Sequence, residues 1–260
     1  MTDYPQNSVN MTLAGAIPVR DGVRERMFAA FDAAGLMPDR WLLGDGPATA
    51  FTRAERFPWE TPGTISFVRE RELPYRLVVF AAPKPTVWLR APAPVSPSDV
   101  RRLAELADRL CEVLTPDVAF VNNLVVPPPG SNDDDARLQS VMNLAARATP
   151  EKYRNVGPGG LAMRTHFGPF LVAQIGRERL LSLPAPTRVT ELAWGGVRID
   201  LVPEPWLASQ ASLRQAFATT RAHLEPAQFF TRAELAPNGG FRVLPPLEPS
   251  PDRDPGGRVR

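Results

Sequence analysis

The stretch from Thr64 to Ala91, TISFVRERELPYRLVVFAAPKPTVWLRA, decides the fold class. It holds three runs rich in β-branched and aromatic residues, which are Thr64–Glu70, Tyr75–Ala81 and Thr86–Ala91. A Glu/Arg-rich segment separates the first two runs, and prolines separate the second from the third. These residue types favour strands, and proline favours the turns between them. Three successive strands of this kind predict an antiparallel meander.

The segment that follows, SPSDVRRLAELADRLCEVLTP (residues 96–116), predicts a long helix. Its apolar residues recur at helical spacing and form one stripe: Val100, Leu103, Leu106, Ala107, Leu110 and Leu114. We expect Ser98 to cap the N-terminus of this helix and Pro116 to end it. The single cysteine, Cys111, lies on the apolar side, so we expect a buried structural thiol and no intrachain disulfide.

The rest of the chain contains further strand and helix patterns. We expect strands at 11–19, 117–122 and 239–247, a hairpin formed by 187–194 and 196–203 around Gly195-Gly196, and helices at 21–35, 133–148, 170–176, 211–224 and 227–235. In the first of these helices, Asp21 is the expected N-cap and Gly35 the residue that ends it.

Helices and strands are mixed along the chain without a regular strand–helix–strand alternation. This order predicts an α+β protein with mostly antiparallel sheets packed by several helices. With 260 residues, we expect a single large domain or two intimately packed halves. The expected parts are a flexible N-terminus (1–10), an N-terminal α+β half (11–126), a C-terminal α+β half (127–247) and a disordered tail (248–260).

Composition and charge limit the classes of partner. The 30 basic residues include only two lysines and are nearly balanced by 28 acidic residues, for a net charge of +2. Arginines alternate with acids instead of forming one basic stretch, so we expect no binding to nucleic acid. No apolar run is long enough to span a bilayer and no signal segment opens the chain, so we expect a cytoplasmic protein that does not bind membranes.

Residues able to carry catalysis or bind metal are scarce. The only histidines, His166 and His223, are 57 positions apart, and the one cysteine is distant from both, so no metal site with nitrogen and sulfur ligands is predicted. No nucleophile elbow, phosphate-binding loop or dinucleotide-binding motif is present. We therefore expect a protein that is not an enzyme and that needs no metal or cofactor.

A few residues remain as candidates for partner binding. Tryptophan and arginine at loop positions are typical of the centres of protein interfaces, although each tryptophan here also fits a place in the core. The aspartate run at 133–135 suits a basic partner, but it also suits the positive end of a helix dipole with no partner. The candidates are Trp59, Asp133, Asp134, Asp135, Arg164, His166 and Trp194.

One part of the chain, roughly residues 98–206, resembles bacterial immunity proteins of the type VI secretion and polymorphic-toxin systems. The resemblance rests on a long helix followed by PDVAFV, on Phe167-Gly168-Pro169, on a short helix closed by Gly176, on the segment from Leu180 to Pro184, and on Gly195-Gly196 leading to Leu201 and two prolines. The resemblance implies a cytoplasmic protein that binds a cognate toxin and neutralises it, and it brings no catalytic residues. We expect this protein to be a monomer or a homodimer.

Two other functions stay open from the residues alone. One is an enzyme of unrecognised type with a site near His166 and the neighbouring glycine-rich stretch. The other is an adaptor or structural component of a secretion or phage-like assembly, in which proline-rich segments serve as recognition strands.

Overall fold

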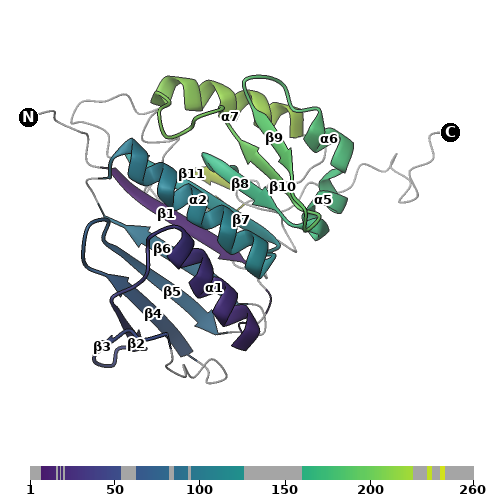
Figure 1. Cartoon of the computed structure of the whole chain (residues 1–260). Coiled ribbons are helices and arrows are strands. Elements are labelled where there is room, and N and C mark those ends of the chain that lie inside the picture. The colour runs from purple at the N-terminus through teal and green to yellow at the C-terminus, as the bar shows by residue number, and fades with distance from the viewer. Residues whose placement is uncertain are drawn as a thin grey trace, which may run out of the picture.

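We describe a computed structural model of the chain. It describes residues 7–15, 17, 19, 21–53, 63–81, 85–92, 95–125, 160–224, 233–235 and 241–243. The fold is α+β, as the sequence predicts: a ten-stranded antiparallel sheet with helices against it (Figure 1). Among the described residues, no helix is both long and apolar enough to cross a bilayer.

The sheet has the order β3-β2-β4-β5-β6-β1-β7-β8-β10-β9. Its strands are β1 (Asn7–Ala14), β2 (Arg40–Leu43), β3 (Thr49–Ala50), β4 (Gly63–Arg69), β5 (Tyr75–Ala81), β6 (Thr86–Ala91), β7 (Val118–Val125), β8 (Arg164–Phe167), β9 (Arg188–Glu191) and β10 (Val197–Asp200). The described helices are α1 (Asp21–Ala33), α2 (Pro97–Leu114), α5 (Pro169–Ile175), α6 (Arg177–Leu181) and α7 (Gln210–Leu224). A separate hairpin joins β11 (Ala233–Leu235) and β12 (Phe241–Val243).

The predicted meander is confirmed, because β4, β5 and β6 pair antiparallel in sequence order. Helices α1 and α2 lie across one face of the sheet (Figure 1). Residues paired directly across strands share a face, and on this face they are apolar and buried. Each strand contributes every second residue to this core: Ile65, Phe67, Leu77, Val79, Val87, Leu89, Val9, Met11 and Leu13.

The core is extended by the helices. The predicted stripe of α2 is buried, and Cys111 is buried beside it as expected. Phe28 of α1 contacts Phe67 of β4 edge to face, with ring centroids 5.6 Å apart. Burial of this apolar surface is the main favourable term for packing both helices on the sheet.

The predicted C-terminal end of α1 is confirmed, whereas the N-cap of α2 differs from the prediction. Helix α1 has Asp21, the predicted N-cap, as its first helical residue, and it ends before Gly35, which has a φ of +65°. The amide of Gly35 donates to the carbonyl of Asp32 and that of Leu36 to the carbonyl of Phe31, which is a Schellman motif. Helix α2 is capped by Ser96 and not by Ser98, because the Ser96 hydroxyl accepts from the Asp99 amide and Pro97 occupies the first turn.

Several boundaries differ from the sequence-based expectation. Strand β1 runs over 7–14 and not 11–19, so Asn7–Asn10, expected in a flexible terminus, belong to a strand paired on both sides. Strands β2 and β8 were not predicted. Residues 233–235, expected at the end of a helix, form β11, where each residue pairs with one of β12. The helix expected at 133–148 lies outside the described residues.

The second half of the chain continues the sheet of the first. Strand β8 pairs with β7, and β10 and β9 follow it as the predicted hairpin around Gly195-Gly196. Position 168, immediately after β8, requires glycine because two backbone segments approach each other closely there. Its amide donates to the carbonyl of Asp117 at 2.8 Å, and a Cβ at this position would lie 2.2 Å from the carbonyl oxygen of Pro116.

We expect Ser96→Ala to lower the free energy of unfolding by about 1 kcal/mol, because it removes the acceptor for a helix N-terminal amide. Ser98→Ala is the matched control and should cost less, because the Ser98 hydroxyl bonds only the Ser96 hydroxyl. Urea denaturation followed by circular dichroism measures both. Equal losses would contradict the capping role of Ser96.

We expect Gly168→Ala to destabilise the fold by about 1–3 kcal/mol or more, since backbone atoms cannot move aside as a flexible side chain can. The control is Gly22→Ala in α1, where a Cβ meets nothing within 4 Å and alanine favours the helix by up to about 1 kcal/mol. The melting temperature measured by thermal denaturation should therefore fall in Gly168→Ala and rise in Gly22→Ala.

Candidate functional site

Two of the predicted candidates, Arg164 and His166, lie together in a buried cluster of charged and polar side chains. They occupy alternate positions of β8 and face α2, as Arg198 and Asp200 of β10 do. The register places Arg164 directly opposite Asp200, and His166 directly opposite Arg198. Asp108 of α2 reaches the same point from the helix. The cluster therefore combines three elements that are far apart in the sequence.

Asp108 is the acceptor at the centre of this cluster. Its Oδ2 accepts from Nη1 of Arg164 and from Nη1 of Arg198, each at 2.9 Å. Its Oδ1 lies 2.8 Å from Nε2 of His166. Arg164 also donates through Nε to the carboxylate of Asp200, which lies near Arg198 as well. Two guanidinium groups thus face two carboxylates, which balances the charge of the cluster.

The surroundings of the cluster exclude most solvent. Arg164 is 4% exposed, His166 1% and Asp200 1%, whereas the side chain of Asp108 is 22% exposed. The guanidinium carbon of Arg164 lies 5.4 Å from the centre of the Trp206 ring, a distance suited to a cation–π contact. A buried charge is costly unless it is paired and hydrogen-bonded, and these contacts supply both.

The cluster changes the acidity of its central carboxylate. Burial by itself raises the pKa of Asp108, but the hydrogen bond from His166 and the charges of His166, Arg164 and Arg198 outweigh it, so the pKa lies below its usual value of 3.8. By contrast, burial raises the pKa of the Cys111 thiol well above its usual value, helped by Asp108 and Glu112. Cys111 is therefore held as an inert thiol, since the thiolate is the reactive form.

The pairing of His166 with a carboxylate has the geometry of a catalytic dyad but lacks access. A general base has to come within about 2.6–3.2 Å of the proton it removes, directly or through one water. The side chain of His166 is fully buried, and its Nδ1 has no hydrogen-bond partner among the described residues. In this conformation the cluster acts as a connection between α2, β8 and β10. No group of three or more metal-binding side chains occurs among the residues that the structure describes.

The remaining candidates are divided between the hairpin and undescribed segments. Trp194 is half-buried at the turn between β9 and β10, where its ring lies against Gly196. Its indole Nε1 is buried and has no hydrogen-bond partner in the part of the chain that the structure describes. Trp59 and Asp133, Asp134 and Asp135 lie outside the described residues. The structure thus brings Arg164 and His166 together inside the protein and leaves Trp194 nearer the surface.

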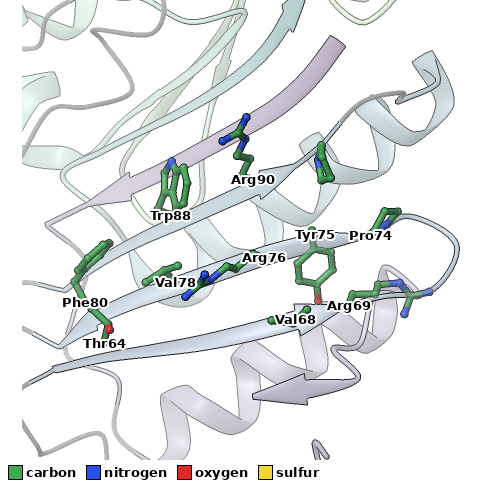
Figure 2. Close-up of a pocket in the computed structure, with 11 residues that line it drawn as sticks. Thr64, Val68, Arg69, Pro74, Tyr75, Arg76, Val78, Phe80, Trp88 and Arg90 are labelled. Atoms are coloured by element: carbon green, nitrogen blue, oxygen red, sulfur yellow. The ribbon is translucent and has the colours of Figure 1, made fainter. Parts of the chain in front are cut away.

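A second candidate surface lies on the other side of the sheet from α1 and was missed by the sequence-based search. Strands β4, β5 and β6 line an open depression of about 690 Å³ (Figure 2). Its aromatic and apolar residues are Phe80, which is 43% exposed, Trp88 and Val78. Two exposed arginines, Arg76 and Arg90, lie beside them. We call this surface the Arg–Trp face.

The sequence did contain a signal for the Arg–Trp face. In the predicted meander, the residues between the buried ones are the arginines Arg76 and Arg90 and the aromatics Phe80 and Trp88. Aromatic residues and arginine are enriched in protein interfaces. The alternation of the strands could therefore have located this face, but only the register shows that the arginines are direct neighbours.

Comparison with known proteins shows a similar fold among solved structures. No protein-family model matches the sequence, and no curated protein matches it. Among solved structures, the chain is similar to the Pseudomonas aeruginosa T6SS protein PA0821, with a TM-score of 0.56. The alignment covers 88% of this chain and 76% of that chain, at 14% sequence identity. At this identity the likeness concerns the fold.

We expect the charged cluster around Asp108 to make the free energy of unfolding depend on pH. A carboxylate whose pKa is lowered by folding contributes stability that is present above its unfolded pKa, about 3.9, and lost as the pH falls through the folded value. The free energy of unfolding of the native protein should therefore decrease below about pH 4. Urea denaturation at pH values between 7 and 3 measures this decrease.

In Asp108→Asn, we expect the unfolding free energy at pH 7 to fall by about 3–5 kcal/mol, because the buried Arg164 and the half-buried Arg198 lose their shared partner. The acid-dependent part of the curve should also become shallower, because this carboxylate no longer titrates. Asp45→Asn, in the turn after β2 at an exposed position, is the control and should change neither quantity. A native pH dependence in Asp108→Asn would show that other groups cause it.

Proposed function

We propose that this protein is an immunity-type inhibitor of a type VI secretion or polymorphic-toxin system, and that it acts in the cytoplasm by binding a cognate effector. The observation that carries the proposal is the fold similarity to the T6SS protein PA0821 over 88% of this chain. That similarity supports a relation to type VI secretion. The immunity role is inferred from the resemblance of residues 98–206 to immunity proteins.

The polar residues of the Asp108 cluster have a structural role, which agrees with a protein that inhibits by binding. The arginines and aspartates of the cluster contact one another and connect α2 to the sheet, and the side chain of His166 is fully buried. Such a scaffold is rigid, and a preorganised surface loses less entropy when it binds. On this proposal the protein blocks its effector by covering it, and the Arg–Trp face is a surface suited to that task.

An enzyme that uses His166 is the second candidate, because His166 does lie 2.8 Å from a carboxylate oxygen. That function requires a conformation that opens the space between α2 and β8. The substitution His166→Gln distinguishes this enzyme from the proposed inhibitor. If protection from the effector survives this substitution in a folded variant, His166 is not a catalytic base for that function.

We expect cells that express a toxic effector encoded beside this gene to grow only when this protein is co-expressed, because the complex covers the effector. Empty vector and an effector from an unrelated system are the controls. The two purified proteins should also elute together in size-exclusion chromatography, as a complex of one or two copies of each chain.

Two outcomes would contradict the proposal. One is the absence of both protection and complex formation with every effector encoded nearby. The other is elution of the protein alone as a large homo-oligomer, which would favour a structural component of a secretion or phage-like assembly.

A further inference from the structure

The Arg–Trp face carries two like charges that are direct neighbours. Arg76 of β5 and Arg90 of β6 are register partners, so their side chains leave the sheet side by side on the same face. Both are exposed. Like charges directly opposite each other destabilise a sheet, and an anion placed between them would remove that cost.

Among the described residues, these two arginines have no acidic partner of the kind that other arginines have. Arg40, Arg53 and Arg71 each form an ion pair with a carboxylate on the same half of the chain. Within the residues that the structure describes, Arg76 makes one hydrogen bond, to the hydroxyl of Ser66 at 3.2 Å, and Arg90 makes no polar contact. The Arg–Trp face therefore presents two guanidinium groups whose donors are largely unused.

Apolar and aromatic side chains lie immediately beside this pair. One register step along the strands, Trp88 of β6 is paired with Val78 of β5, and Phe80 follows on β5 (Figure 2). The depression of about 690 Å³ that they line is the size of a site for a few side chains. An arginine pair next to a half-buried tryptophan combines the residue types that dominate the binding energy of interfaces.

We propose that the Arg–Trp face binds an acidic segment of the partner protein, in which a carboxylate lies between Arg76 and Arg90 and an apolar side chain covers Trp88 and Phe80. The guanidinium groups bind a carboxylate through charge-assisted hydrogen bonds. The identification of the partner as an effector rests on the proposed function, but the chemistry of the face stands without it.

A protein segment fits this face better than a nucleic acid does. Non-specific binding to nucleic acid requires many phosphate contacts, and a basic domain supplies them from clustered lysines and arginines. Here two cations that form no ion pair with a described residue lie beside an apolar surface, and the net charge of the chain is only +2. A protein segment with one or two carboxylates and an apolar side chain is complementary to these two cations and the apolar surface.

The sharpest test is Arg90→Glu, because it separates binding from folding. The new carboxylate lies directly opposite Arg76, so the like-charge pair becomes an opposite-charge pair, and the melting temperature should equal or exceed that of the native protein. The affinity for the effector should fall at least about tenfold, because the partner's carboxylate then meets a negative charge. Arg26→Glu is the matched control, as Arg26 is exposed on α1, across the sheet from the Arg–Trp face.

Isothermal titration calorimetry measures the affinity of each variant for the effector that co-elutes with the native chain. The result separates the assignment of the Arg–Trp face from the proposed function. Native affinity in Arg90→Glu would overturn the assignment of this face and leave the proposed function intact. Loss of affinity in Arg90→Glu and in Arg26→Glu alike would also overturn it, because the effect would then follow net charge and not position.

If the native chain binds no effector, the proposed function fails and a second probe tests the face alone. The probes are a synthetic peptide of glutamate and leucine and a single-stranded oligonucleotide of the same charge. In NMR spectra, the peptide should shift the amides of β4–β6 and the indole signal of Trp88, and Arg90→Glu should abolish these shifts. Shifts caused only by the oligonucleotide, or none at all, would overturn the proposal.

Discussion

The Asp108 carboxylate accepts hydrogen bonds from two strands while it sits on a helix that packs on other strands. Arg164 and His166 reach it from β8 and Arg198 reaches it from β10, although these residues follow Asp108 by 56 to 90 positions. Because a buried charge is tolerated only with its partners in place, α2 has one favourable position over these strands. The position of the second half of the sheet relative to the first therefore depends on this contact and on the β7–β8 ladder.

The two faces of the sheet differ in composition and in their contribution to stability. Under α1 and α2, the side chains of β4, β5, β6 and β1 are apolar, and their burial holds the helices. On the Arg–Trp face the same strands place Arg76 and Arg90 side by side, at an electrostatic cost that a core would not tolerate. One face thus provides the stability that permits an unfavourable arrangement on the other. Natural proteins concentrate such local costs where they bind partners.

This division relates the fold to the proposed inhibitor. The polar residues that first suggested chemistry are held inside, where they position α2, and the residues available to a partner are arginine, tryptophan and phenylalanine on an open sheet. On the proposed function, shape and surface charge are the means of action, and both require a scaffold that does not deform. The similarity to PA0821 extends over most of that scaffold.

Local pattern was enough to determine the α+β class, the β4–β6 meander, the β9–β10 hairpin, the apolar stripe of α2 and the burial of Cys111. Each of these depends on residues near one another in the chain, whose periodicity reports which side is buried. Strand β8 could not be recognised, because its core-facing residues are Arg164 and His166, and such residues are buried only when distant partners compensate them. Those partners, and the pairing of Arg76 with Arg90, depend on helix position and strand register, which only the tertiary structure decided.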